Sequence, residues 1–133
     1  MRDQEEVQAS LGARQVLVVD DHELVRQLIV EVLRSSGLDV VQADSGQSAL
    51  SIVSQSKDRI GCIVQDMSMP GMSAPETISE TLKVFPKAKI VVLSVDDEAM
   101  VRQELGGNKV VGYLQKPCDT DVLINTVRKV LDS

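Results

Sequence analysis

The chain alternates five times between a short run of β-branched residues and a longer segment with helical spacing. The short runs are Gln15–Asp20, Leu38–Ala43, Ile60–Gln65, Lys89–Ser94 and Val110–Leu114. Several are almost continuously apolar, which is typical of parallel strands covered by helices on both faces. Right-handed crossovers restrict how five such units connect, and the strand order 2-1-3-4-5 is favoured. We therefore expect a single-domain α/β fold: a doubly wound, five-stranded parallel sheet with helices on both faces.

The segments between the runs carry helix signals. The first apolar stripe consists of Leu24, Val25, Leu28, Ile29, Val32 and Leu33, and the last of Val122, Leu123, Thr126, Val127, Val130 and Leu131. Gly37 is expected to end the first helix and Pro86 the third. Ser73 and Glu76 form a capping box, with Pro75 in the first turn of the third helix.

Composition narrows the classes of function. A length of 133 residues suits one domain, and 43% hydrophobic with 26% charged residues is typical of a soluble globular protein. The net charge of -6 argues against a nucleic-acid-binding surface, which needs clustered Lys and Arg. No apolar run approaches the roughly 18 residues of a membrane span, so we expect no membrane contact and a cytoplasmic location. Residues 1–14 are polar and aperiodic, and we expect a flexible tail before a domain of residues 15–133.

Polar residues stand where four of the predicted strands end. In parallel sheets of this type, ligands bind beyond the carboxyl ends of the strands, at the point where the strand order reverses. The residues at these ends are Asp20, Asp21, Asp66, Ser94 and Lys116. Carboxylates about 4 Å apart repel by about 4 kcal/mol at an effective dielectric near 20, and a hard cation such as Mg²⁺ relieves this repulsion. An ammonium group and a hydroxyl beside such an ion suit an added anion, as in an aspartyl-phosphate site.

On these residues the sequence resembles the receiver domain of two-component response regulators, which has a flavodoxin-like fold. The matching motifs are Val18-Val19-Asp20-Asp21-His22, Ala43-Asp44-Ser45-Gly46, Asp66-Met67-Ser68-Met69-Pro70-Gly71-Met72, Ser94 and Tyr113-Leu114-Gln115-Lys116-Pro117. They occur in order, with family-like spacing, from about Gln15 to the C-terminus.

The resemblance implies a role for each matched residue. Asp66 would accept a phosphoryl group from a histidine kinase or a histidine phosphotransfer protein. Lys116 would pair with the phosphate, Ser94 would move toward the phosphoryl oxygens, and Tyr113 would change rotamer in response. The implied Mg²⁺ ligands, with Mn²⁺ as a substitute ion, are Asp20, Asp21, Asp66 and the backbone carbonyl of Ser68.

The resemblance also describes the protein as a whole. The Lys116–Pro117 bond would be cis. The protein would be a signalling switch rather than an enzyme, with only self-phosphorylation and autodephosphorylation chemistry. It would act on a downstream effector or output domain, without binding nucleic acid itself.

Several positions depart from the family pattern, among them Ser73-Ala74, which replaces the usual Asp-Gly pair. Gln65 precedes Asp66 where an apolar residue is usual, so its side chain must find a partner or point toward the site. Val95 follows Ser94 where a small residue is common, and its branched side chain would narrow access to the phosphoryl pocket. Gly106-Gly107 predicts a fourth helix about one turn short, because paired glycines continue a helix poorly. We therefore expect intact chemistry with an atypical output surface.

Other interpretations remain open at this point. The chain could be a receiver-like binding module that is not phosphorylated. An aspartate-nucleophile phosphohydrolase would carry a second acid where Ser68 stands, and a flavodoxin-type flavin carrier would not place two acids at its phosphate loop. His22 is expected in the first helical turn near solvent, with no assigned role. Cys62 is expected in the core, and Cys118 is incidental.

Overall fold

The computed structural model describes residues 13–69 and 71–133, so residues 1–12 of the predicted tail at 1–14 lie outside the described residues. The last tail residue, Arg14, forms an ion pair with Asp132 at 3.1 Å. Five parallel strands form one sheet in the order β2-β1-β3-β4-β5, as predicted. The strands are β1 (Gln15–Val19), β2 (Val40–Ala43), β3 (Ile60–Asp66), β4 (Ile90–Ser94) and β5 (Gly112–Gln115). The order reverses between β1 and β3, which pair directly with each other.

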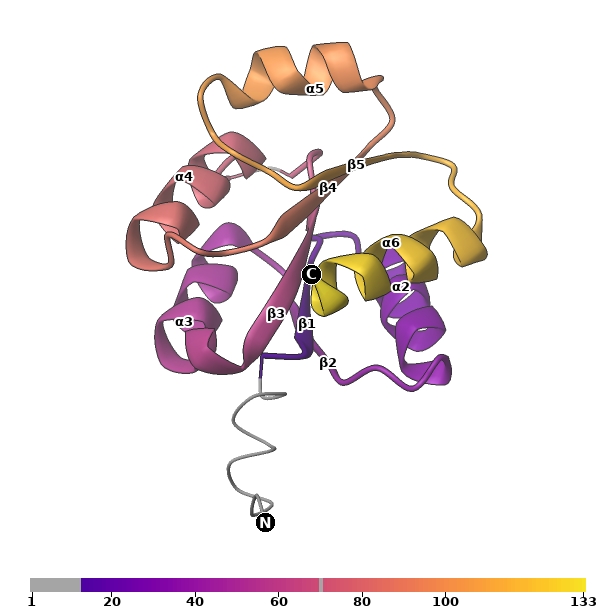
Figure 1. Ribbon diagram of the computed structural model, residues 1–133. Coiled ribbons are helices and arrows are strands. Elements are labelled where there is room, and N and C mark those ends of the chain that lie inside the picture. Colours follow the sequence, from indigo (N-terminus) through magenta and orange to yellow (C-terminus); the bar gives the residue numbers. More distant parts are fainter. Residues whose placement is uncertain (1–12, 70) are drawn as a thin grey trace.

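The helices lie in two layers on the sheet (Figure 1). They are α2 (Glu23–Ser35), α3 (Gly46–Ser56), α4 (Ala74–Val84), α5 (Glu98–Leu105) and α6 (Thr120–Asp132), with a 3₁₀ turn η1 (Lys57–Arg59) before β3. Helices α2 and α6 cover one face, and α3, α4 and α5 cover the other. None of the helices within the described ranges is both long and apolar enough to cross a membrane.

Each face of the sheet has its own apolar core. Alternate strand residues such as Val16 and Val18 pack against α2 and α6, while Leu17 and Val19 pack against α3 and α4. Every residue of β4 is buried, as expected for an inner parallel strand covered on both sides. The sheet is therefore held rigidly from both sides, and its strand ends are fixed relative to one another.

Two of the predicted local patterns are wrong in detail. Leu24 and Leu28 of the first stripe are 78% and 63% exposed, and the buried face of α2 instead contains Arg26, Ile29, Val30 and Leu33. The last strand begins at Gly112 rather than Val110, and Val111 is 55% exposed. In the described sheet β5 pairs only with β4, so its residues are covered less than those of the inner strands.

The predicted helix boundaries are confirmed. Gly37 follows the end of α2 with a φ of 90°, a conformation that suits glycine. The Ser73 hydroxyl accepts a hydrogen bond from the Glu76 amide at 3.2 Å and starts α4. Helix α5 has eight residues, fewer than any other described α-helix, and Gly106 ends it with a φ of 61°.

The loop between β2 and α3 is packed closely against α4. A Cβ atom at Gly46 would collide with the Thr77 hydroxyl, so a side chain has no room there. The Ser45 hydroxyl accepts a hydrogen bond from the Ser48 amide at 3.0 Å and caps α3. The Ala43-Asp44-Ser45-Gly46 motif therefore has a structural role, in fixing α3 beside α4.

Candidate functional site

Strand register brings the first part of the site together. Asp66 at the end of β3 pairs with Leu93, so Ser94 lies one residue further along the neighbouring strand. Ser94 in turn pairs with Gln115, which places Lys116 at the same edge of the sheet. The Lys116 ammonium group donates a hydrogen bond to Asp66 Oδ1 at 2.8 Å. The side chains at the ends of β3 and β5 therefore lie together, as predicted. The Lys116–Pro117 bond is cis, as the resemblance implied.

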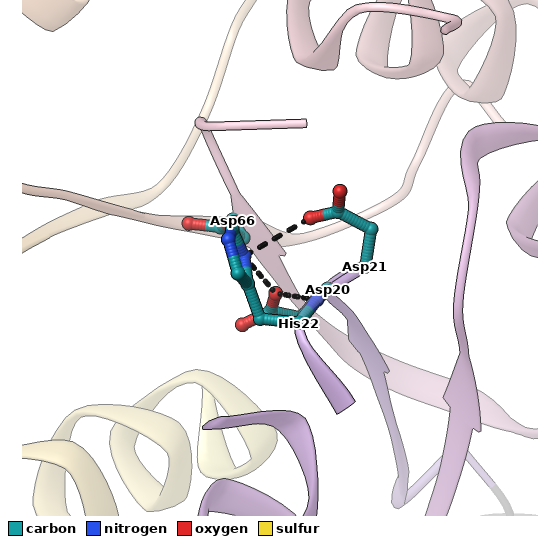
Figure 2. A group of neighbouring side chains, drawn as sticks. All are labelled: Asp20, Asp21, His22 and Asp66. Atoms are coloured by element: carbon teal, nitrogen blue, oxygen red, sulfur yellow. Dashed lines mark hydrogen bonds and ion pairs between the residues drawn. The ribbon is translucent and has the colours of Figure 1, made fainter. Parts of the chain in front are cut away.

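Two further carboxylates reach Asp66 from the end of β1. Asp20 and Asp66 are each 1% exposed, and the side chain of Asp21 is 21% exposed. One ligand oxygen from each acid, together with a ring nitrogen of His22, lies within 4.8 Å of all the others. Figure 2 shows these four side chains pointing toward one another.

The carboxylates are only partly satisfied. Within residues 13–69 and 71–133, no hydrogen-bond partner reaches the buried oxygens Asp20 Oδ2, Asp21 Oδ1 and Asp66 Oδ2. Buried polar atoms normally have partners, and unpaired anionic oxygens are especially costly. Three such oxygens in one small space are suitable donors for a hard divalent cation.

His22 takes part in this cluster, which its sequence position did not indicate. It is the residue that precedes α2, and its main-chain N–H donates a hydrogen bond to Asp20 Oδ1 at 2.8 Å. Its side chain is 59% exposed, as expected near solvent, yet Nδ1 lies 3.1 Å from Asp21 Oδ1 and 3.4 Å from Asp20 Oδ1. Asp66 Oδ2 is 4.0 Å from the same nitrogen. His22, rather than either acid, occupies the cap position of α2, so the carboxylates of Asp20 and Asp21 do not serve as its cap.

The surroundings of Asp66 oppose its ionisation. Burial raises the pKa of its carboxyl group above the ordinary value, and the charge on Asp20 raises it further. The Lys116 hydrogen bond and charge act in the opposite direction, as does a main-chain hydrogen bond from Ser68. A cation placed among the acids would favour the charged form of this carboxyl group.

Arg26 and Gln42 support the site, and the sequence patterns did not single them out. Arg26 is 9% exposed, although it is a charged residue on a surface helix. Its Nη1 donates a hydrogen bond to the Asp20 main-chain oxygen at 2.9 Å, and its Nε donates to Gln42 Oε1 at 2.8 Å. The guanidinium group thus joins α2 to the ends of β1 and β2. The only signal in the sequence was a charged residue inside the apolar stretch of the first helix.

The Gln65 side chain finds a partner in the neighbouring main chain. It is 2% exposed, and its Nε2 donates a hydrogen bond to the Asp66 carbonyl oxygen at 2.9 Å. Its Nε2 also lies 3.8 Å from Met69 Sδ, in the loop that follows β3. Gln65 therefore holds the main chain at Asp66, and the expectation that its side chain must find a partner is met.

Ser94 and Tyr113 line a common cavity of about 180 Å³ on the α5 side of the sheet. The Ser94 hydroxyl accepts a hydrogen bond from the Asp96 amide at 3.0 Å. The guanidinium carbon of Arg102 lies 4.8 Å from the centre of the Tyr113 ring, and Arg102 also pairs with Glu98 at 2.8 Å. Tyr113 is therefore half-buried between the cavity and a charged residue of α5 rather than being part of a closed core.

The remaining candidates take no part in the acid cluster. Cys62 is buried, and burial raises the pKa of its thiol to about 12, so it stays protonated and unreactive. Val95 is 65% exposed and lines an apolar cavity of about 480 Å³ with Lys116 and Cys118. Val95 thus stands beside the Lys116 side chain, at the edge of the site.

Comparison with known proteins agrees with this arrangement. Residues 16–128 match the family described as the response regulator receiver domain. The sensor kinase CckA of Brucella abortus is 32% identical over 121 residues, which cover 91% of this chain and 13% of the kinase. The response regulator GacA of Pseudomonas aeruginosa is 34% identical over 117 residues, which cover 86% of this chain and 54% of GacA. The chain therefore spans 13% of the length of the kinase and 54% of the length of GacA.

A solved structure supports both the fold and the family. The response regulator protein TrrA of Thermotoga maritima, in complex with Mg²⁺ and BeF, superposes with a TM-score of 0.78 at 29% identity. The alignment covers 88% of this chain and 98% of TrrA. With its parallel sheet of order 2-1-3-4-5 and its family match over residues 16–128, this chain belongs to the response regulator receiver domains of two-component systems.

Proposed function

We propose that Asp66 is the phosphoacceptor of this receiver domain, in a unit that extends over residues 15–133. The observation that carries the proposal is the 2.8 Å contact between Lys116 Nζ and Asp66 Oδ1, beside three buried carboxylate oxygens that no described residue satisfies. A fixed ammonium group on one side and carboxylate oxygens that would hold a metal cation on the other suit transfer of a phosphoryl group to a carboxylate.

The donor set fits a hard divalent cation. The proposed ligands are Asp20, Asp21, Asp66 and the main-chain carbonyl of Ser68, with Mg²⁺ as the ion and Mn²⁺ as a substitute. Mg²⁺ accepts a few carboxylates and keeps waters and phosphate oxygens as its other ligands. It would supply charge neutralisation for the acids and for the incoming phosphoryl oxygens.

The chemistry of the step follows from the position of Asp66. One carboxylate oxygen attacks the phosphorus of a phosphohistidine, the new O–P bond forms, and the P–N bond breaks as the imidazole leaves. Lys116 remains beside the acceptor and pairs with a phosphoryl oxygen in place of Asp66 Oδ1. Hydrolysis of the acyl phosphate by water returns the free carboxylate. The protein then turns over no substrate beyond its own acceptor residue.

Ser94 and Tyr113 line the same cavity, so a movement of the Ser94 side chain can be followed by a movement of the Tyr113 ring. When the Ser94 hydroxyl leaves the Asp96 amide and turns to a phosphoryl oxygen, it opens space on the side that Tyr113 borders. Tyr113 would then rotate inward and leave Arg102. The switch would be read on the α5 and β5 surface by a downstream effector or output domain, and the donor would be a histidine kinase or histidine phosphotransfer protein.

Mass spectrometry of the intact chain tests this proposal. Incubation with acetyl phosphate and Mg²⁺ should add one phosphoryl group to the parent protein and none to Asp66→Asn. An Asp96→Asn variant, which changes a nearby acid outside the cluster, should still be modified. If the parent protein gains no phosphate and forms no beryllofluoride adduct, it is a receiver-like binding module instead.

A further inference from the structure

The His22 side chain is not used in the proposed phosphoryl transfer, yet its ring nitrogen lies among all three acids (Figure 2). We infer that His22 Nδ1 is a fourth side-chain ligand of the cation site. We further infer that it shifts the preference of the site from Mg²⁺ toward nitrogen-accepting ions such as Mn²⁺, Co²⁺ and Ni²⁺. This inference rests on the proposed cation site and concerns which ion the site selects.

The spacing of the donor atoms fits a coordination sphere. With metal–ligand distances of about 2.1 Å, ligands at right angles are about 3.0 Å apart and opposite ligands about 4.2 Å apart. His22 Nδ1 lies 3.1, 3.4 and 4.0 Å from oxygens of Asp21, Asp20 and Asp66. The largest separation within the group is no more than 4.8 Å, so a small inward movement completes the sphere.

The acids supply independent support for a bound ion. Asp20 Oδ2 and Asp66 Oδ2 belong to side chains that are 1% exposed, and no described residue donates a hydrogen bond to either oxygen. Asp21 Oδ1 likewise has no partner in hydrogen-bond geometry, although the His22 ring is only 3.1 Å away. The ring therefore lies beside the carboxylates without donating a hydrogen bond to their free oxygens. This arrangement is expected when the ring nitrogen and the oxygens are ligands of one ion.

A nitrogen ligand changes the order of ion preference. Mg²⁺ is a hard ion that favours oxygen ligands, whereas imidazole suits the transition ions, whose affinity rises from Mn²⁺ through Co²⁺ to Ni²⁺. His22 should therefore add affinity for the transition ions and little for Mg²⁺. Because the ring is 59% exposed, it can turn onto the ion without disturbing the core.

Direct detection of the nitrogen is possible because His22 is the only histidine in the chain. In tag-free protein loaded with Mn²⁺, pulsed electron paramagnetic resonance should show nitrogen modulation from an imidazole ligand. The modulation should vanish in His22→Phe, which keeps a ring of similar size, and His22→Asn provides a second variant that suits a helix cap.

Calorimetric titrations then measure ion preference. Removal of the imidazole should weaken Co²⁺ and Ni²⁺ binding by about tenfold or more and change Mg²⁺ binding by less than about twofold. Asp21→Asn should weaken all of these ions together. Both His22 variants should behave alike, because neither offers the imidazole nitrogen.

The outcomes separate this inference from the proposed site. Bound Mn²⁺ without nitrogen modulation, or equal losses for Mg²⁺ and Co²⁺ in His22→Phe, would overturn the role of His22 and leave a carboxylate site. Failure of the parent protein to bind any of these ions would remove the cation site itself, and the role of His22 with it.

Discussion

Replacement of the Asp66 carboxylate by an amide should make the metal-free protein more stable. At separations up to 4.8 Å, the repulsion between two carboxylates is about 3.5 kcal/mol or more at an effective dielectric near 20. The charges on Asp20 and Asp21 together therefore raise the electrostatic free energy of the ionised Asp66 carboxylate by about 7 kcal/mol. Attraction to the Lys116 ammonium group, 2.8 Å from the carboxylate, lowers the same free energy by about 6 kcal/mol at the same dielectric.

The difference of about 1 kcal/mol opposes the charge on Asp66, and the burial of its carboxyl group acts in the same direction. We therefore expect Asp66→Asn to raise the free energy of unfolding by about 1–2 kcal/mol in EDTA at neutral pH. Urea denaturation measures this difference directly. The exposed acid Glu104 provides a control, and Glu104→Gln should change stability by less than about 0.5 kcal/mol.

The same cluster predicts the opposite sign for Lys116→Met. This change leaves three acids without their cation, and we expect it to destabilise the metal-free protein by about 3 kcal/mol. A loss of stability in Asp66→Asn as well would refute the balance of charges worked out above. In that case the hydrogen bond between Lys116 and Asp66 would outweigh the repulsion.

The raised pKa of Asp66 also predicts how the free energy of unfolding changes with pH. Its folded state holds the proton more tightly than the unfolded chain, so the stability that this residue contributes is present at low pH. That contribution is lost as the pH rises from about 3.9, the ordinary aspartate pKa, through the raised pKa of the folded state. In EDTA, this decline should be present in the parent protein and absent from Asp66→Asn. Identical pH profiles would contradict the assignment.

Three further predictions test other parts of the molecule. Val95→Ala should speed phosphorylation by acetyl phosphate, because it removes branched bulk beside the site, while stability stays within about 0.5 kcal/mol in urea denaturation. Gly106→Ala should cost about 1–3 kcal/mol, since the φ of 61° strains any side chain, whereas Gly107→Ala, with open space and no such φ, should be neutral or slightly stabilising in the same assay. Tyr113 is the only tyrosine in a chain without tryptophan, so its intrinsic fluorescence should change on addition of beryllofluoride and Mg²⁺ and stay constant in Asp66→Asn.

Much of the fold could be predicted because its signals are local. Continuous Val, Ile and Leu runs indicated inner strands, and the turns at Gly37 and Ser73 lie where backbone chemistry requires them. The orientation of α2 could not be predicted in the same way. Its apolar arc is wider than its contact with the sheet, and its buried face includes Arg26, whose hydrogen bonds depend on residues in other elements.

The same holds for the site: some of its contacts could be predicted from the sequence, and others depend on residues in other elements. Convergence of Asp20, Asp66 and Lys116 followed from the rule that parallel strands end at one edge of the sheet. The place of His22 did not follow from that rule, because it depends on how one ring turns at the start of a helix. Gln65 likewise required knowledge of a neighbouring main-chain oxygen, which the sequence alone does not position.

The Arg26 guanidinium group has a consequence for how fast the site takes up its ion. By bonding the Asp20 main-chain oxygen and Gln42, it fixes the end of β1, where the His22 main-chain N–H also holds the Asp20 carboxylate before any ion arrives. Little of the entry barrier then comes from movement of the chain, and the slow step becomes removal of water from the ion. Mg²⁺, which gives up its waters reluctantly, should therefore enter more slowly than Ca²⁺ or Mn²⁺. Acids that had to swing inward would instead give all three ions one common rate, set by the protein.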